Sequence, residues 1–244
     1  MNSFPAIEID KVKAWDFRLI DENTAESLNV AYGVDSNYLD GVGVSITSIV
    51  INNRHVNLDF YIIADVYNDD FFQKVEKLAE QYQLRITLYR INTDNLQCLP
   101  CTQVWSRAMY FRLFAFQLLG VTLNRLLYLD ADVVCKGNIS QLLHLEFNGA
   151  VAAVVRDVDP MQEKAVVRLS DPELRGQYFN SGVVYLDLKK WTEAKLTEKA
   201  LSILMSKDSI YKYPDQDVMN VLLKGMTIFL PREFNTIYTC LLYT

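Results

Sequence analysis

A chain of 244 residues is long enough to form one large α/β domain with a proper hydrophobic core. Half of the residues are hydrophobic and 22% are charged, which is ordinary for a globular protein. The formal net charge of -6 argues against nucleic-acid binding as the main activity, because a phosphate backbone requires a basic surface. Residues 1–10 carry no secretion signal, and no apolar run approaches the roughly 20 residues of a membrane-spanning helix, so we expect a cytoplasmic protein.

The cysteine and histidine pattern argues against a zinc or redox site. The chain has four cysteines: Cys98, Cys101, Cys135 and Cys240. Zinc would need a second ligand pair beside the Cys-Leu-Pro-Cys spacing, and neither His55 nor His144 can supply one. A thioredoxin-like motif should open a helix after the first strand, whereas this one follows the third. We therefore expect reduced cysteines and structural histidines.

The first half of the chain alternates between strand and helix patterns. Residues 1–27 mix charges with Trp15 and Phe17, and we interpret them as an N-terminal arm preceding one domain over residues 28–244. Strands are expected at 28–32, 58–64, 85–91 and 126–129. Helices are expected at 41–53, after a cap at Asp69 or Asp70, and between Ser106 and Gly120. This order predicts a mostly parallel sheet with helices on both faces, whose ligands bind beyond the carboxyl ends of the strands.

The second half is less regular. A strand at 150–155, a helix near 164–169 and a strand at 183–188 are expected in turn. An amphipathic helix at 191–205, a helix running from Tyr213 to Gly225 and a strand at 228–230 follow. We see no internal repeat and no Gly- or Ser-rich linker, which favours a single domain.

An Asp-x-Asp follows the apolar strand 126–129. Side chains alternate in extended backbone, so Asp130 and Asp132 point the same way, with Ala131 between them. Their charges repel each other unless a hard divalent cation lies between them and the phosphate oxygens of a ligand. The alternative is a pair of solvated turn aspartates.

The loop after the first strand contains Asp35, Asn37 and Tyr38. Asp and Asn side chains can accept hydrogen bonds from a base or a ribose, and a Tyr ring can stack on a base. The alternative is a plain Asx turn. Because this loop and the Asp130 loop both follow strands, both can line one crevice.

Three further polar positions have both a functional and a structural interpretation. Arg112 lies in an apolar helix, where it either reaches to water or binds a phosphate or a sugar hydroxyl. Residues 179–182 form either a tight turn or a polar cluster in which Gly182 allows close approach. Asp215 and Gln216 either cap a helix or hold a polar, uncharged ligand such as a sugar.

Five segments in this order and spacing resemble glycosyltransferase family 8, and within it the bacterial lipopolysaccharide core glucosyl- and galactosyltransferases. They are Tyr32-Gly33-Val34-Asp35-Ser36-Asn37-Tyr38, Tyr110-Phe111-Arg112-Leu113, Leu127-Tyr128-Leu129-Asp130-Ala131-Asp132, Tyr178-Phe179-Asn180-Ser181-Gly182-Val183 and Pro214-Asp215-Gln216-Asp217. The resemblance implies a GT-A fold, a donor that is UDP-glucose or UDP-galactose, and an acceptor in the lipopolysaccharide core.

The resemblance also implies roles for individual residues. Residues 33–38 would hold uridine and ribose, and Asp130, Ala131 and Asp132 would lie at the UDP diphosphate, with Mg²⁺ or Mn²⁺ on the two aspartates. The positions that match the surroundings of the donor sugar are Arg112, Asp157, Asn180, Asp215 and Gln216. The family retains the α configuration. An amide such as Gln216 is a poor nucleophile, so a front-face mechanism is favoured over a double displacement.

The chain departs from the family pattern at its end. It stops at Thr244, before a His-x-x-Gly-x-x-Lys-Pro-Trp segment that supplies a metal ligand and diphosphate contacts, and before a basic region that meets the inner membrane. We therefore expect a truncated domain with weakened metal and UDP binding. Two rival hypotheses remain: a catalytically impaired UDP-sugar-binding remnant, and a phosphatase of the haloacid dehalogenase type with Asp130 as nucleophile.

Overall fold

The strands form a single sheet. The structure is a computed structural model, and it describes residues 7–19, 26–101, 106–206 and 211–237. The strands are β1 (Ile9–Asp16), β2 (Leu28–Val34), β3 (Leu58–Ala64), β4 (Arg85–Ile91), β5 (Arg125–Leu129), β6 (Ala152–Arg156), β7 (Phe179–Asp187) and β8 (Thr227–Phe229). Their order across the sheet is β1-β4-β3-β2-β5-β7-β6-β8. Among these described strands four neighbouring pairs are parallel and three are antiparallel, which confirms the predicted mostly parallel sheet.

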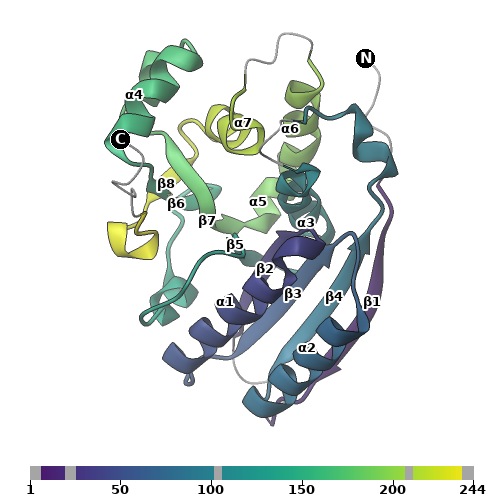
Figure 1. The fold of residues 1–244 in the computed structure, drawn as a ribbon. Coiled ribbons are helices and arrows are strands. Elements are labelled where there is room, and N and C mark those ends of the chain that lie inside the picture. The colour runs from purple at the N-terminus through teal and green to yellow at the C-terminus, as the bar shows by residue number, and fades with distance from the viewer. Residues whose placement is uncertain (1–6, 20–25, 102–105, 207–210, 238–244) are drawn as a thin grey trace, which may run out of the picture.

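Helices cover both faces of the sheet (Figure 1). They are α1 (Leu39–Asn52), α2 (Asp69–Tyr82), α3 (Phe111–Leu119), α4 (Asp159–Arg168), α5 (Leu188–Glu193), α6 (Leu196–Leu204) and α7 (Pro214–Leu222). The apolar sides of α1 and α2 pack on one face of the sheet, and those of α3, α5, α6 and α7 on the other. This layering explains why the central strands are continuous apolar runs, since both of their faces are buried.

The strand predictions for the first half are confirmed closely. Strands β3 and β4 have the predicted bounds, and every residue of β3 is buried. The predicted cap of α2 was wrong by one residue: the Oδ1 atom of Asn68 accepts from the Phe71 amide at 2.7 Å, whereas Asp69 and Asp70 lie in the first turn. A carboxylate in the first turn still suits the positive end of the helix dipole.

The residues assigned to the N-terminal arm include an edge strand. Strand β1 pairs antiparallel with β4, and Trp15 is its buried residue. The indole of Trp15 donates a hydrogen bond to Glu76 of α2 at 3.0 Å. Because the other side chains of β1 face partly or wholly into solvent, its sequence carries no apolar alternation strong enough to predict a strand.

Several predicted boundaries in the second half were wrong. Strand β7 begins at Phe179, so the polar residues 179–182 belong to the strand itself. The helix predicted over 191–205 is two helices, α5 and α6, separated at Lys195, which has a left-handed φ of 51°. Ser106 precedes a 3-10 turn at Arg107–Tyr110 and does not cap an α-helix with its side chain. His144 lies in a 3-10 turn at Ser140–His144.

The expectations about membranes and cysteines hold within the described part of the chain. None of the described helices combines the length and apolar character needed to cross a bilayer. Cys98 and Cys135 are free cysteines, as expected for a reduced protein. Cys240 lies outside the described residues.

Candidate functional site

The two predicted loops lie side by side at the carboxyl ends of β2 and β5. These strands are parallel neighbours, with Ala31 opposite Tyr128. The Tyr128 hydroxyl accepts a hydrogen bond from the Gly33 amide at 3.2 Å. A Cβ at Gly41, in the first turn of α1, would lie 3.1 Å from the carbonyl oxygen of Ala131. The loop at 33–38 and the turn at 130–132 therefore border one another, as the sequence predicted.

The loop at 33–38 is an Asx turn with an exposed aromatic ring. The Asp35 carboxylate accepts from the Asn37 amide at 3.0 Å and from the Ser106 hydroxyl at 2.7 Å. Asp35 thus has the structural role that the alternative interpretation assigned to it. Tyr38 is 58% exposed and immediately precedes α1, the helix whose Gly41 approaches Ala131. An exposed aromatic face at this position can stack on a base.

Arg112 is the centre of the site. It is only 4% exposed, so it does not reach out to water. One amino group lies 2.7 Å from Asp130, Nε lies 3.1 Å from Asp215, and the other amino group donates to the Ser181 carbonyl at 2.6 Å. The guanidinium also lies over the Tyr128 ring, 4.8 Å from its centroid. One buried cation therefore joins β5, β7 and α7.

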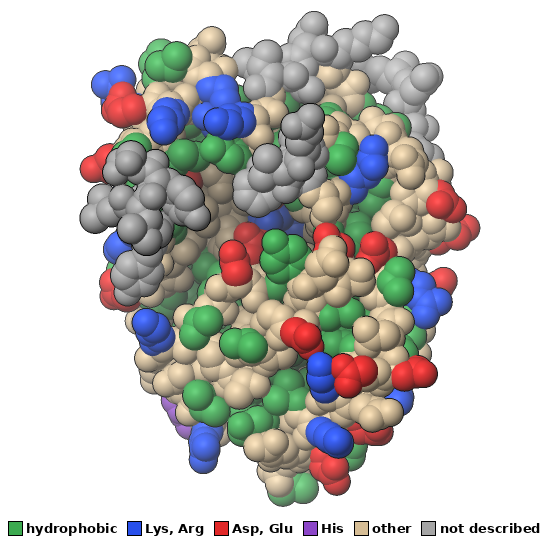
Figure 2. Space-filling model, viewed as in Figure 1, with side chains coloured by type: hydrophobic (Ala, Val, Ile, Leu, Met, Phe, Trp, Pro, Cys, Tyr) green, Lys and Arg blue, Asp and Glu red, His purple; other side chains and the backbone are tan. Residues whose placement is uncertain are grey.

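The surroundings of Asp130 disfavour its charged carboxylate form, although part of the side chain remains exposed to solvent. Its pKa is raised to about 6, chiefly because the surrounding protein removes water, and further because Asp215 and Asp132 repel its charge. Arg112 opposes this rise. The Asp130 side chain keeps 38% of its surface exposed, and Asp132 is exposed. Acidic side chains lie across the middle of the molecular face shown in Figure 2.

The donor set at this turn suits a hard divalent cation. Arg112 engages Oδ1 of Asp130, and a Cβ at Gly182 would lie 3.1 Å from Oδ2, so the glycine leaves room beside that oxygen. No group of three or more His, Cys, Asp or Glu side chains that could hold a metal occurs among the described residues. Mg²⁺ is commonly held by one or two carboxylates with waters and phosphate oxygens completing its shell, so Asp130 and Asp132 fit such an ion.

Gln216 is the centre of a second cluster that adjoins the first. Its Oε1 accepts from the Ser181 amide at 3.0 Å and from Asn180 Nδ2 at 3.3 Å. Its Nε2 donates to Asp157 Oδ2 and to the Tyr178 hydroxyl, each at 3.0 Å. The Ser181 peptide therefore links the clusters, because its carbonyl accepts from Arg112 and its amide donates to Gln216.

The structure brings together most of the predicted site residues. Hydrogen bonds or ion pairs connect six of them: Arg112, Asp130, Asp157, Asn180, Asp215 and Gln216. These contacts do not include Asp132, which lies close enough to Asp130 to raise its pKa.

Sequence reasoning missed the residues that hold Gln216 in place, namely Tyr178, Asp217, Asn220 and Arg168. Tyr178 and Asp217 stand inside the quoted motifs, so their polar character was a usable signal. Arg168 carries no such signal, because it ends a charged helix of ordinary composition.

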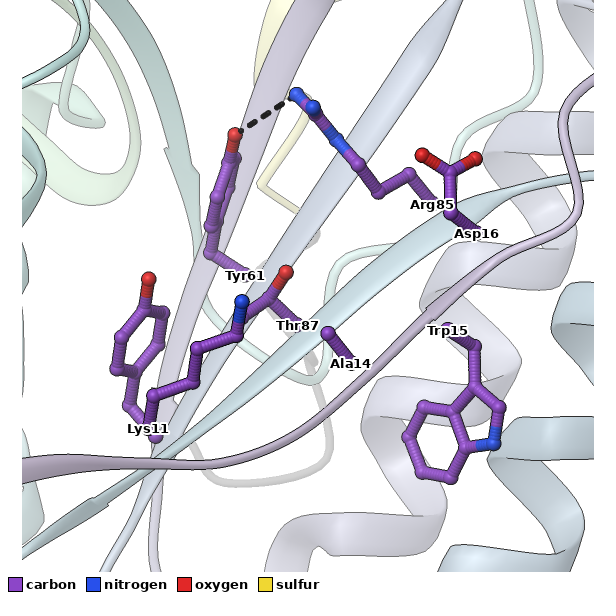
Figure 3. A pocket seen from close by; sticks show the side chains of 8 residues that line it. Lys11, Ala14, Trp15, Asp16, Tyr61, Arg85 and Thr87 are labelled. Atoms are coloured by element: carbon purple, nitrogen blue, oxygen red, sulfur yellow. Dashed lines mark hydrogen bonds between the residues drawn. The ribbon is translucent and has the colours of Figure 1, made fainter.

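Two grooves lie away from this site. One, of about 310 Å³, runs along β1 and β4 and includes Lys11, Tyr61 and Arg85 in its lining (Figure 3). In it the Arg85 guanidinium donates to the Tyr61 hydroxyl at 3.3 Å. The other, of about 560 Å³, lies between α1 and α2 and has a mostly apolar lining. None of the predicted site residues lines either groove.

Comparison with known proteins gives a consistent result. The family profile "Glycosyl transferase family 8" matches residues 29–243. The chain is 88% identical over 239 residues to a lipopolysaccharide 1,2-glucosyltransferase of Escherichia coli K12, which covers 98% of this chain and 71% of that protein. It is 35% identical to a lipopolysaccharide 1,3-galactosyltransferase of Salmonella typhimurium LT2, over 91% of this chain and 67% of that protein.

A solved structure supports the fold. The galactosyltransferase LgtC, in complex with donor and acceptor sugar analogues, superposes with a TM-score of 0.71 at 22% identity. The match covers 84% of this chain and 74% of that one. At this level of identity the likeness shows the fold alone, and it confirms the predicted GT-A architecture.

Proposed function

This chain belongs to glycosyltransferase family 8, and from that premise we propose that it transfers a hexose from a UDP-sugar to the lipopolysaccharide core. The donor is UDP-glucose or UDP-galactose, and the transfer retains the α configuration. The names of the relatives support the acceptor, since they are lipopolysaccharide glucosyl- and galactosyltransferases. Because lipopolysaccharide core is carried on a lipid, we also propose that the enzyme works in the cytoplasm, at the inner membrane.

One observation carries the proposal. Arg112 holds Asp130, Asp215 and the Ser181 carbonyl at once. Through these contacts the turn at 130–132 is fixed between the loop at 33–38 and the Gln216 cluster. In a UDP-sugar the diphosphate joins the nucleoside to the sugar. With the nucleoside on the loop at 33–38 and the sugar at the Gln216 cluster, the diphosphate would therefore lie at Asp130.

Each part of the site has a distinct proposed role. Residues 33–38 bind uridine and ribose, with the exposed Tyr38 ring stacking on the base. Asp130 and Asp132 hold Mg²⁺ or Mn²⁺, with Ala131 at the diphosphate; when bound, the cation neutralises the negative charge that develops on the leaving UDP. The residues that orient the donor sugar are Arg112, Asp157, Asn180, Asp215 and Gln216.

The hydrogen bonding around Gln216 supports a front-face reaction. A double displacement needs a carboxylate that is free to attack the anomeric carbon. The Asp157 oxygens accept hydrogen bonds from the Val158 amide at 2.8 Å and from Gln216 at 3.0 Å, and Asp215 is paired with Arg112. We propose instead that the departing UDP phosphate takes the acceptor proton while the amide of Gln216 faces the anomeric centre.

Neither rival hypothesis is favoured by the comparisons. A phosphatase would use Asp130 as a covalent nucleophile, whereas here one of its oxygens is held by Arg112 at 2.7 Å. Nothing in the comparisons favours an impaired remnant either, and donor turnover distinguishes it from an active enzyme. The interpretation of residues 28–244 as one GT-A domain remains a proposal.

Donor turnover tests the proposed function directly. We expect this chain to release UDP from UDP-glucose or UDP-galactose in the presence of Mn²⁺ and isolated lipopolysaccharide core, and to stop when EDTA is added. Proton NMR of the product should give an α-linked hexose. Gln216→Ala should lose most of its turnover, leaving a measurable residual rate, but keep its affinity for UDP. Hydrolysis of p-nitrophenyl phosphate without any UDP-sugar dependence, or a covalent sugar adduct on Asp157 or Asp215, would contradict this account.

A further inference from the structure

Gln216 presents its amide to the site in only one of two orientations. The two ends of a carboxamide have nearly the same shape, so hydrogen-bond partners decide which end points where. Here Oε1 faces Ser181 and Asn180, whereas Nε2 faces Asp157 and Tyr178. Because a carbonyl and an NH₂ group interact in opposite ways with a sugar hydroxyl, this orientation matters for any donor that reaches Gln216.

The Tyr178 hydroxyl can accept from Gln216 only if its own hydrogen points elsewhere. That hydrogen goes to Asp217 Oδ1, 2.6 Å away. The pKa of Tyr178 is raised, first because the hydroxyl is buried and then because Asp217 is close, so the hydroxyl stays protonated. The Gln216 NH₂ group therefore donates to the Tyr178 hydroxyl, and the Tyr178 hydroxyl donates to Asp217.

Asp217 is in turn held as an acceptor by Arg168. The carboxylate is completely buried, and Arg168 binds it through two nitrogens, at 2.6 Å and 3.2 Å. The amides of Lys212 and Tyr213 also donate to it, each at 3.1 Å. A bidentate contact of this kind fixes the orientation of the carboxylate more tightly than a single hydrogen bond does. Arg168 comes from α4, a helix that supplies none of the proposed donor contacts.

Helix α4 holds Tyr178 at its backbone as well. Gln162 Nε2 donates to the Tyr178 carbonyl at 2.6 Å, and Gln162 Oε1 accepts from the Tyr178 amide at 3.2 Å. Arg168 of the same helix donates to the Tyr178 hydroxyl at 3.3 Å, so α4 contacts Tyr178 at both its hydroxyl and its backbone. A side chain held in this way has little freedom to turn, which is what precise orientation of a reacting group requires.

We propose that Arg168, Asp217 and Tyr178 are positioning residues, which set the orientation of the Gln216 amide for sugar transfer. This inference rests on the proposed function of Gln216. None of the three touches the donor in this account; they act through Gln216. The specific consequence is that Tyr178→Phe should impair catalysis only in a protein that still has Gln216.

A double-mutant cycle tests this consequence. We expect Tyr178→Phe to lower kcat about tenfold, because slight misplacement of a reacting group is costly, while the Kd for UDP stays within about twofold. Adding Tyr178→Phe to Gln216→Ala should then lower kcat no further. Tyr67→Phe is the matched control, since it also removes a buried hydroxyl, which donates to the Ile62 carbonyl at 2.7 Å. It should leave kcat unchanged.

Four outcomes of the activity measurements would overturn the inference. If the losses from Tyr178→Phe and Gln216→Ala add together, or if Tyr178→Phe alone has no effect, Tyr178 does not act through Gln216, and the proposed function stands. If Gln216→Ala keeps full turnover, the proposed role of Gln216 fails and the inference fails with it. Arg168→Lys, which keeps the charge, should retain more activity than Arg168→Gln, and the reverse order would also contradict the proposal.

A spectroscopic measurement separates the inference from catalysis. The side-chain NH₂ protons of Gln216 have two acceptors, so their exchange with solvent should be slow in the parent protein. In Tyr178→Phe one acceptor is gone, and we expect faster exchange and a shifted ¹⁵N resonance, with an unchanged backbone amide spectrum elsewhere. An unaltered Gln216 side-chain resonance would overturn the positioning role even if activity changes.

Discussion

The two halves of the molecule are stabilised in different ways. In the first half, β2 to β4 pack between α1 and α2 on one side and α3 on the other, and apolar side chains form most of their core. Among the described residues, the one buried carboxylate of this core, Asp59 of β3, is paired with Arg18 and Arg85. The ion pairs on α1 and α2 lie at the surface, as in Lys74 with Asp40 and Asp70. In the second half, buried polar groups contact one another and also contact Arg112, which α3 contributes from the first half. Arg112, Asp215, Gln216, Asp217 and Asn220 are all less than 9% exposed.

The difference between apolar packing and buried polar contacts indicates which half of the molecule carries the reacting groups. Burying polar groups is unfavourable unless every one has partners, and a fully partnered network holds its members in one arrangement, as a binding or catalytic site requires. The first half supplies a rigid support and the loop at 33–38. The second half supplies the groups that we propose to act on the donor sugar. Variants in the two halves should therefore fail in different ways.

The largest effect should come from Asp130, at the boundary between the halves. Asp130→Asn keeps the side-chain shape but removes the charge that would hold the cation and pair with Arg112. We expect kcat/KM for UDP-sugar turnover to fall about a thousandfold, the scale on which loss of one electrostatic stabiliser acts. Asp70→Asn, on the surface of α2, is the control and should change turnover by less than twofold.

The next largest effect should be the loss of unfolding free energy in the variant Asp217→Asn. Asp217→Asn leaves Arg168, whose side chain is 15% exposed, with no charged partner, and we expect a loss of about 3 kcal/mol of unfolding free energy, the low end of the range for a broken buried pair. Urea denaturation at pH 7.5 measures this change. The comparison in the first half is Asp40→Asn, whose exposed pair with Lys74 should contribute nothing measurable. Equal losses for the two variants would refute the contrast between the halves.

The pH dependence follows from Asp130. Because its folded pKa of about 6 lies above the unfolded value of about 3.9, the folded protein binds the extra proton. Its contribution to the unfolding free energy therefore falls as pH rises from about 4 to 6, in the protein without metal. A cation must displace that proton, so UDP with Mn²⁺ should raise Tm by about 5 °C at pH 7.5 and much less at pH 5. An equal rise at both pH values would contradict the assignment of Asp130 as a ligand.

The smallest effects should come from two glycines. A Cβ at Gly33 would lie 2.8 Å from Phe111 Cβ and 3.0 Å from the Tyr128 hydroxyl, so Gly33→Ala should destabilise the fold by about 1–3 kcal/mol. A Cβ at Gly43, inside α1, meets nothing within 4 Å. Gly43→Ala should stabilise the fold by about 0.5–1 kcal/mol, because alanine favours a helix. Thermal unfolding distinguishes these opposite signs.

The sequence predicts the first half well because its structure is local and apolar. Strand β3 reads as a run of seven buried residues, and β4 alternates, so their bounds could be predicted to the residue. The same patterns fail where long-range contacts decide the structure. The break at Lys195 and the edge strand β1, buried mainly through Trp15, have no periodic signal.

In the site too, local motifs could be predicted from the sequence, whereas long-range contacts could not. Asp130, Asn180, Asp215 and Gln216 could be proposed as site residues because they stand in spaced motifs that resemble a known family, and Asp157 because it matches a family position outside those motifs. Their connection through Arg112 and the Ser181 peptide could not, since sequence spacing carries no information about hydrogen-bond partners. Arg168 was missed for a similar reason, because its partner Asp217 lies 49 residues later in the chain.

The most direct measurement is a crystal structure with UDP and Mn²⁺ bound. The account predicts the uracil ring on Tyr38, the diphosphate at the turn 130–132, and the cation coordinated by Asp130 and Asp132. UDP bound in the groove along β1 and β4, or a cation bound without contact to Asp130, would contradict it.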